Sequence, residues 1–145
     1  MYYRFFLLSI FFSFTVNAQI TNGVDSQTFE NGSLKYEISY KDKLKHGKEI
    51  FWYESGQKKM ESHFVNGIEH GSWMQWYKNG QLKLKIFYKN GQKNGLWNQW
   101  YKNGQLKSNV EFINGIKQGL ETIWDKNGFI QSQDTYLNGK VIISN

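Results

Sequence analysis

Three histidines, His46, His63 and His70, are the side chains in this sequence best suited to binding a metal ion. Zinc would require ring nitrogens at about 2.1 Å from a single ion. His46 and His70 are 24 residues apart, and a separation of two strands in a sheet would place them ~9.6 Å apart. The equivalent positions further along the chain hold Asn94 and Gln118, as expected of a polar turn position. We therefore expect no metal site and no cofactor.

Other groupings that support catalysis are also missing from the sequence. The absence of cysteine excludes a thiolate nucleophile and a disulfide framework. The carboxylates form no pair at equivalent positions, and no Ser–His–Asp set is indicated. Each Asn-Gly pair lies between strand-like segments rather than before a helix, so a phosphate-binding loop is not indicated either. The sequence predicts a protein that is not an enzyme.

A basic zone with interleaved aromatic residues is the strongest binding feature of the sequence. No acidic residue occurs between Gly71 and Val110, and the whole chain has a formal net charge of +6. Such a zone suits an anionic partner, for example lipid headgroups, an acidic glycan or an acidic protein patch. The alternative interpretation is that the lysines keep a long sheet soluble and discourage edge pairing. The predicted partner surface comprises Trp73, Tyr77, Lys78, Lys83, Lys85, Trp97, Tyr101, Lys102 and Lys107.

An internal repeat of 24 residues must position these side chains. The nine residues QWYKNGQLK occur at 75–83 and again at 99–107. Thirteen of the 14 glycines fall into three columns with the same spacing. The aromatic residues form two more columns, which are Trp52, Trp76, Trp100 and Trp124, and Tyr40, Phe64, Tyr88, Phe112 and Tyr136. A catalytic site would be singular, so a pattern that recurs four to five times predicts a stacked structural unit.

Each unit is predicted to be a β-hairpin. In the copy at 72–95, a strand at Trp73–Tyr77 leads through Lys78-Asn79-Gly80 into a second strand at Gln81–Tyr88 and a longer turn at Lys89–Gly95. Asn-Gly between two strand-like runs favours a tight turn, because both residues tolerate positive φ. The second strand alternates with the period of two that a strand with one buried face requires. Its apolar side is formed by Leu82, Leu84, Ile86 and Tyr88, and its polar side by Lys83 and Lys85.

The sequence leaves two registers open across the first turn. If Lys78-Asn79-Gly80 is a three-residue loop with Gly80 in the left-handed region, Trp76 joins the face of the leucines. If Asn79-Gly80 alone forms the turn, Trp73 and Tyr77 join that face instead. The first register is favoured because it gathers Met74 and Trp76 with the leucines. The aromatic strip on the less apolar face is then Trp73, Tyr77, Trp97 and Tyr101, or, in the second register, Trp76 and Trp100.

Side by side, these hairpins predict an all-β fold. The expected architecture is an elongated antiparallel meander of roughly ten strands, forming a single twisted sheet or half-pipe. The repeat domain is predicted at 30–145, after a polar lead-in at 19–29. Its copies span about 30–47, 48–71, 72–95, 96–119 and 120–145, and the terminal copies depart from the pattern because each has one neighbour.

Residues 1–18 predict a secretory signal peptide. Arg4 precedes an apolar run of 12 residues, Phe5 to Val16, and compact residues precede a cleavage site near Ala18. A membrane-spanning helix would need roughly 20 apolar residues. We therefore expect an exported protein (periplasmic, cell-surface or secreted), for which a nucleic-acid partner is not expected.

The unit W-x-x-W-Y-x-N-G-Q-L-K, followed by an aromatic residue, Asn-Gly and a closing Gly, resembles the MORN-variant repeat over residues 30–145. Proteins of this kind are often labelled YwqK-type antitoxins of toxin–antitoxin systems, and others are described as exported or membrane-associated. Cell-wall-binding repeats are also similar in their W…WY hairpins, although their units are shorter. The resemblance to the MORN-variant repeat implies a binding or scaffolding surface with no catalytic residues.

We expect a non-enzymatic exported protein that binds a protein or envelope partner through its sheet. One alternative is an attachment module for anionic lipid or glycan that uses Lys78, Lys83, Lys85 and neighbouring aromatic residues. A second alternative, an antitoxin-like inhibitor of a partner protein, rests on the resemblance. The sequence does not indicate the partner or the oligomeric state.

Overall fold

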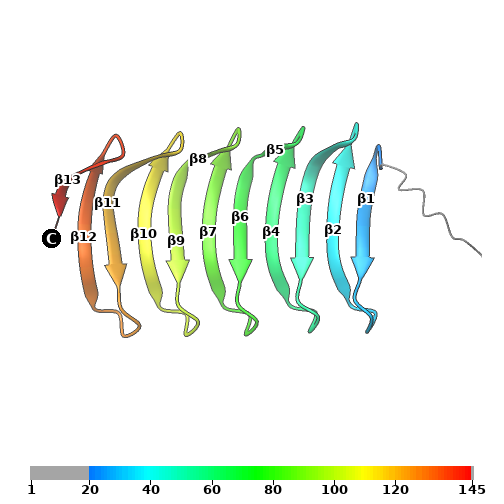
Figure 1. Cartoon of the computed structure of the whole chain (residues 1–145), viewed down its shortest axis with the longest axis horizontal. Helices are drawn as coiled ribbons and strands as arrows, with labels where there is room; N and C mark the ends of the chain where they lie inside the picture. The colour runs from blue at the N-terminus through cyan, green and yellow to red at the C-terminus, as the bar shows by residue number, and fades with distance from the viewer. Residues whose placement is uncertain (1–19, 145) are drawn as a thin grey trace, which may run out of the picture.

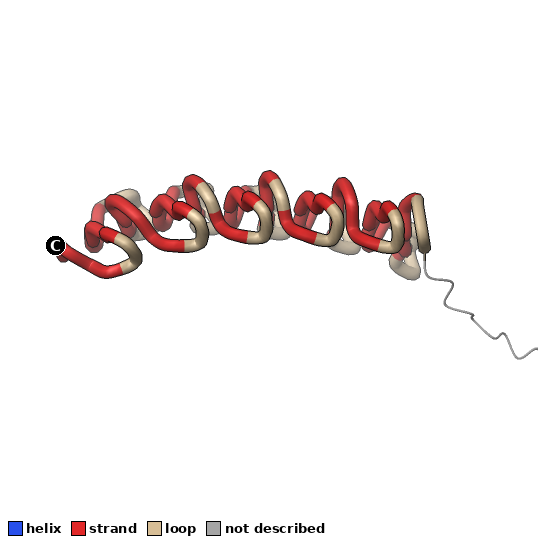
Figure 2. The backbone as a smooth tube through the Cα atoms, turned by 90° about the horizontal axis from the view of Figure 1, so that it is seen from above, coloured by secondary structure: helices blue, strands red, loops and turns tan. Residues whose placement is uncertain are grey.

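The computed structural model describes residues 20–144, so the predicted signal peptide lies outside the described residues. These residues form a single open antiparallel sheet, which confirms the predicted all-β meander. Figure 1 shows the strands following one another along the long axis, and Figure 2 shows the same hairpins stacked in a row from above. The strands are β1 (Gly23–Thr28), β2 (Leu34–Lys41), β3 (Leu44–Trp52), β4 (Lys58–Val65), β5 (Ile68–Glu69), β6 (Gly71–Trp76), β7 (Leu82–Lys89), β8 (Gln92–Lys93), β9 (Gly95–Trp100), β10 (Leu106–Ile113), β11 (Ile116–Trp124), β12 (Ile130–Leu137) and β13 (Lys140–Ser144).

Strands that are consecutive in the chain are neighbours in the sheet. The order is β1-β2-β3-β4-β6-β7-β9-β10-β11-β12-β13, and the short strands β5 and β8 pair with β4 and β7. The segment 19–29, expected as a polar lead-in, contains β1, which pairs with β2. Gly23 at the start of β1 has a φ of 124° and lies 24 residues before Gly47, so it extends a glycine column that the sequence analysis began at Gly47.

Two kinds of turn alternate at the two ends of the strands. We call the two lines of turns the edges of the sheet. At the three-residue-turn edge, the Tyr77 N–H donates to the Gln81 carbonyl over 2.9 Å and Gly80 has a φ of 83°, which confirms the three-residue loop. At the opposite, two-residue-turn edge, Asn90 and Gly91 complete the reversal with φ values of 51° and 76°. The predicted longer turn at Lys89–Gly95 is therefore wrong, because two successive residues with positive φ reverse the chain by themselves.

The favoured register is also wrong beyond the first residue pair. Trp76 pairs with Leu82, but a β-bulge then shifts the register, so that Gln75 pairs with Leu84 and Trp73 with Ile86. Because directly paired residues share a face, Trp73 joins Leu84 and Ile86, and Met74 and Trp76 lie on the other side. We call the two sides the Ile86 face, which carries Trp73, and the Lys85 face, which carries Trp76.

Burial in this sheet comes from neighbouring strands, since the described residues form no second layer. Ile86 and Val110, 6% and 1% exposed, are the buried apolar residues of the range 20–144, and they pair with Trp73 and Trp97. In the second repeat, the equivalent positions hold Ser62 and Glu49, which are buried and joined by a hydrogen bond of 3.0 Å. The core is therefore a row of side chains lying across adjacent strands of the Ile86 face.

One two-residue turn lacks glycine and is expected to be strained. Asp42 and Lys43 connect β2 to β3 with φ values of 51° and 66°, where the later repeats have Asn-Gly. A left-handed conformation costs an L-residue about 1–2 kcal/mol, and glycine avoids this cost but loses about 0.5–1 kcal/mol of chain entropy. We predict that Lys43→Gly raises the free energy of unfolding by about 0.5–1 kcal/mol, measured by urea denaturation.

The matched control is Lys41→Gly, two residues earlier in extended strand β2. Here glycine relieves no strain, so stability should fall by about 0.5–1 kcal/mol. A Lys43→Gly protein no more stable than the unmodified chain would contradict the strained-turn interpretation.

Candidate functional site

The structure divides the nine residues of the predicted partner surface into two groups. Trp73 and Trp97 lie half-buried on the Ile86 face, and Lys85 is exposed in the middle of the opposite face. The remaining six residues gather at the three-residue-turn edge. They are Tyr77, Lys78, Lys83, Tyr101, Lys102 and Lys107.

A row of tyrosines organises that edge. The hydroxyl groups of Tyr53, Tyr77 and Tyr101 donate to the backbone carbonyls of Trp76, Trp100 and Trp124 over 2.8, 2.8 and 2.9 Å. Each bond joins one hairpin to the next, which fixes the phenol ring between two turns. Because the tyrosines are two strands apart, their spacing is ~9.6 Å.

Lysine ammonium groups lie against these tyrosine rings. Lys59 and Lys78 are both 5.9 Å from the ring centroid of Tyr53, which is within cation–π range. The distance is 5.7 Å from Lys83 to Tyr77 and 5.6 Å from Lys107 to Tyr101. The repeated arrangement therefore presents positive charge at a fixed place in each hairpin.

Two surface cavities coincide with the first and third tyrosines. A cavity of about 660 Å³ is lined in part by Asn31, Tyr53 and Lys78, and one of about 390 Å³ by Asn79, Tyr101 and Lys126. The second set lies 48 residues after the first, which is two repeats. We use the name tyrosine clefts for the places at Tyr53, Tyr77 and Tyr101, of which the first and third have these cavities.

The two-residue-turn edge of the Lys85 face is apolar. Leu96 pairs with Glu111, and Leu120 with Thr135, which places both leucines on this face. Neither is covered by the sheet, with 57% and 51% of their surface exposed. We define the apolar strip as the exposed residues Phe87, Leu96, Ile113, Ile116, Leu120 and Leu137. This strip was not predicted from the sequence, in which the lysines and the aromatic columns are the prominent features.

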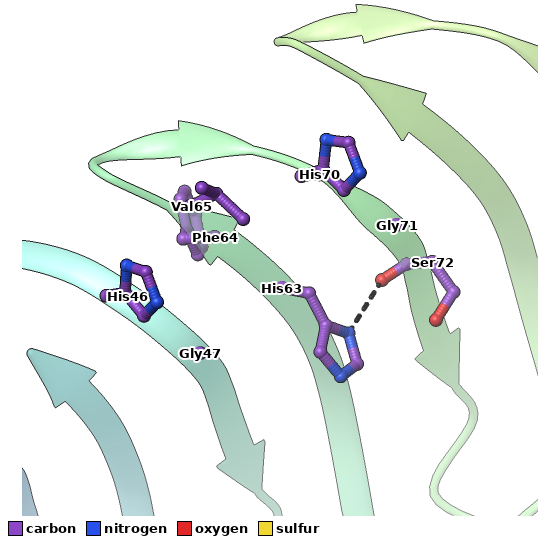
Figure 3. A pocket seen from close by; sticks show the side chains of 8 residues that line it. All are labelled: His46, Gly47, His63, Phe64, Val65, His70, Gly71 and Ser72. Atoms are coloured by element: carbon purple, nitrogen blue, oxygen red, sulfur yellow. Dashed lines mark hydrogen bonds between the residues drawn. The ribbon is translucent and has the colours of Figure 1, made fainter.

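The three histidines line one shallow cavity of about 420 Å³ on the Lys85 face. Figure 3 shows the ring of His63 turned toward Ser72, away from His46 and His70, and its Nδ1 lies 3.3 Å from the Ser72 carbonyl oxygen. The Asn66 N–H approaches His46 Nδ1 at 3.4 Å, as expected of the predicted polar turn position. In residues 20–144, no group of three or more His, Asp or Glu side chains is arranged to hold a metal ion.

Glu61 is a buried carboxylate in the centre of the Lys85 face, with 8% of its side chain exposed. Lys58 donates to it over 2.6 Å, and Lys48 and His63 each lie 4.0 Å away. Burial acts to raise the pKa of the Glu61 carboxyl, but the hydrogen bond and charge of Lys58, helped by Lys48 and His63, hold this pKa below its ordinary value. Glu61 therefore neutralises part of the basic surface in the second repeat.

We predict that Glu61→Gln lowers the free energy of unfolding by about 1 kcal/mol at neutral pH, because it removes this ion pair. The folded pKa lies below the unfolded one, so the stabilisation is complete above the unfolded pKa and is lost as pH falls through the folded pKa. The two proteins should therefore converge in stability in acid. Urea denaturation across the acid range tests this, with the exposed Glu111→Gln as a control that should show little difference at any pH.

No helix in the described range is long and apolar enough to span a membrane.

The comparison with curated proteins found no significant match. The MORN repeat variant profile matches four segments, at residues 29–42, 45–66, 69–90 and 93–114, which together cover more than half of the chain. Repeats of this kind are generally associated with binding to membrane lipids or to proteins. The four matches, on a sheet built from the same repeated hairpin, place this chain in the MORN repeat variant family.

Proposed function

We propose that the protein is exported and acts, without catalysis, as a docking surface for a protein partner at the cell envelope. The observation that carries this proposal is the apolar strip. On the Ile86 face large side chains shield one another, whereas the strip leaves Leu96 and Leu120 more than half exposed. Exposed apolar side chains that gather on one face are typical of interaction sites in proteins.

The composition of the surrounding surface favours a partner with acidic groups. Lys85 and Lys89 of β7 are exposed next to Phe87, and Lys48 is exposed on the same face. Apolar contacts would supply most of the affinity, and the lysines would select for and orient an acidic partner. The same charge would oppose a second copy of the chain docking through this strip.

Photo-crosslinking in cells tests the docking surface. A photoreactive residue at position 96 or 120 is expected to give a discrete adduct with a partner, and Leu96→Ser with Leu120→Ser should reduce capture of the same partner at least tenfold. The matched control is Phe129→Ser with Ile130→Ser, because these residues are 71% and 58% exposed at the other edge. Equal loss from both double variants would contradict a role of the strip.

Export has its own test. The protein recovered outside the cytoplasm is expected to begin at Gln19, as read by mass spectrometry of its N-terminal peptide. Recovery in the cytoplasm with residues 1–18 intact would reject an envelope partner but not the docking strip itself.

A second candidate function, attachment to anionic lipid, is favoured by the lysines beside the apolar strip. Lysines near an anionic bilayer contribute about 1 kcal/mol each, and salt weakens this contribution. Vesicles with and without anionic lipid distinguish the two functions, since lipid attachment predicts sedimentation with anionic vesicles at low salt and loss at high salt. An antitoxin-like role stays a prediction from the resemblance.

A further inference from the structure

We propose that the tyrosine clefts form a binding site for a linear acidic polysaccharide with one carboxylate on each sugar. This site goes beyond the proposed docking function, because it lies at the three-residue-turn edge rather than at the apolar strip. The chain would run along that edge, across the strands, and contact one cleft in each of three successive hairpins.

The first argument is that the lysines at the clefts carry positive charges that are not engaged in ion pairs. Lys59 and Lys78 lie within cation–π range of the Tyr53 ring, Lys83 of the Tyr77 ring and Lys107 of the Tyr101 ring, and Lys102 and Lys126 line the cavity at Tyr101. None of these six lysines forms an ion pair within residues 20–144, although Lys45, Lys58 and Lys117 do. The four ammonium groups held against the rings are therefore free to receive anions, although at Tyr53 they share the cavity with Glu54.

The second argument is the rigidity of the clefts. Each tyrosine is fixed by its hydrogen bond to the next hairpin. The turns are tied together as well, since the Asn79 and Asn103 side chains donate to the Lys102 and Lys126 carbonyls over 2.9 and 3.0 Å. A ligand would meet lysines already held near the rings, so it would lose less entropy in ordering them.

The third argument is the spacing of charge. Two lysines per hairpin correspond to two positive charges for every ~9.6 Å of the edge. A pyranose ring in a linear chain has a length close to the ~4.8 Å spacing of adjacent strands, so a polyuronate would carry about two carboxylates along each ~9.6 Å of the edge. One strand of a DNA duplex has a phosphate for every ~3.4 Å, which is a denser charge than the edge provides.

The limits of the row also fit a ligand that covers three hairpins. The tyrosine position holds Phe29 in the first repeat and Asp125 in the last. Phe29 has no hydroxyl to tie it to the next hairpin, and the carboxylate of Asp125 would repel an anion. A chain of about six uronate residues would therefore fill the row, at two sugars per hairpin.

The test is calorimetric titration of the purified protein with oligogalacturonates of increasing length. Affinity should rise steeply up to about six sugars and then level off, because each added cleft is engaged within one complex. Lys83→Gln with Lys102→Gln and Lys107→Gln should weaken binding of the long oligomer at least tenfold. The control, Lys41→Gln with Lys85→Gln and Lys89→Gln, removes the same charge away from the clefts and should change affinity less than threefold.

Equal losses from the two triple variants would overturn the proposal, because binding would then follow net charge alone. Tighter binding of inorganic polyphosphate or of anionic vesicles through the same three lysines would overturn the assignment to a polysaccharide. If the cleft triple variant fails to unfold cooperatively, Lys102→Gln at an exposed turn gives the same test, with Lys89→Gln as its control. Each outcome leaves the docking strip unaffected, since the strip lies at the other edge.

Discussion

The structure depends on side chains of one strand covering those of the next, because a single sheet has nothing else to bury them. A residue such as Ile86 is shielded by Trp73 beside it and by the neighbouring strand on its other side. This works only if the register is reproduced in every hairpin, since a slip of one residue would move each side chain to the opposite face. The 24-residue period is thus a requirement of the packing: every hairpin must present the same face in the same place.

The turns enforce that register from both edges. At the two-residue-turn edge, the N–H groups of Gly67, Gly91 and Gly115 donate over 2.8 Å to carbonyls of the preceding hairpin. At the other edge, the tyrosine hydroxyl groups donate to carbonyls of the following hairpin. Hairpins are therefore joined through their turns as well as through their strands, which fixes the groups at the edges in place. For this reason both proposed binding sites can lie at the edges.

Much of this architecture could be predicted from the sequence, because glycine and aromatic columns report directly on turns and strands. The alternation of Leu84, Lys85 and Ile86 gave the correct faces for β7. Bulges could not be predicted, since they depend on local backbone geometry that no residue type specifies. The bulge after Leu82 moved Trp73 to the Ile86 face, against the favoured register.

A second backbone irregularity forms an ion pair that likewise could not be predicted from the sequence. Lys45 and Glu49 would be roughly 13 Å apart in a regular strand. Around Gly47, whose φ is 93°, strand β3 instead has extra residues opposite β2, so that Lys45 pairs with Tyr40 and Glu49 with Ile38. This irregularity brings the Lys45 and Glu49 side chains into contact. The same pair recurs as Lys117 and Glu121. In the central repeats Trp73 and Trp97 stand at the place of the glutamate, and residues 71–110 contain no carboxylate side chain.

Both proposed binding surfaces follow from what a single-layer sheet is able to offer. Such a sheet cannot enclose a ligand, and the cavities at the tyrosines and histidines are open to solvent, so one repeat can contribute only weak contacts. The same contact recurs every ~9.6 Å, however, and a partner that engages several copies at once turns each further contact into an intramolecular event. Affinity should then depend on the number of intact repeats and on the length of the partner more than on any single side chain. A long partner with a matching period is the ligand that this geometry recognises best.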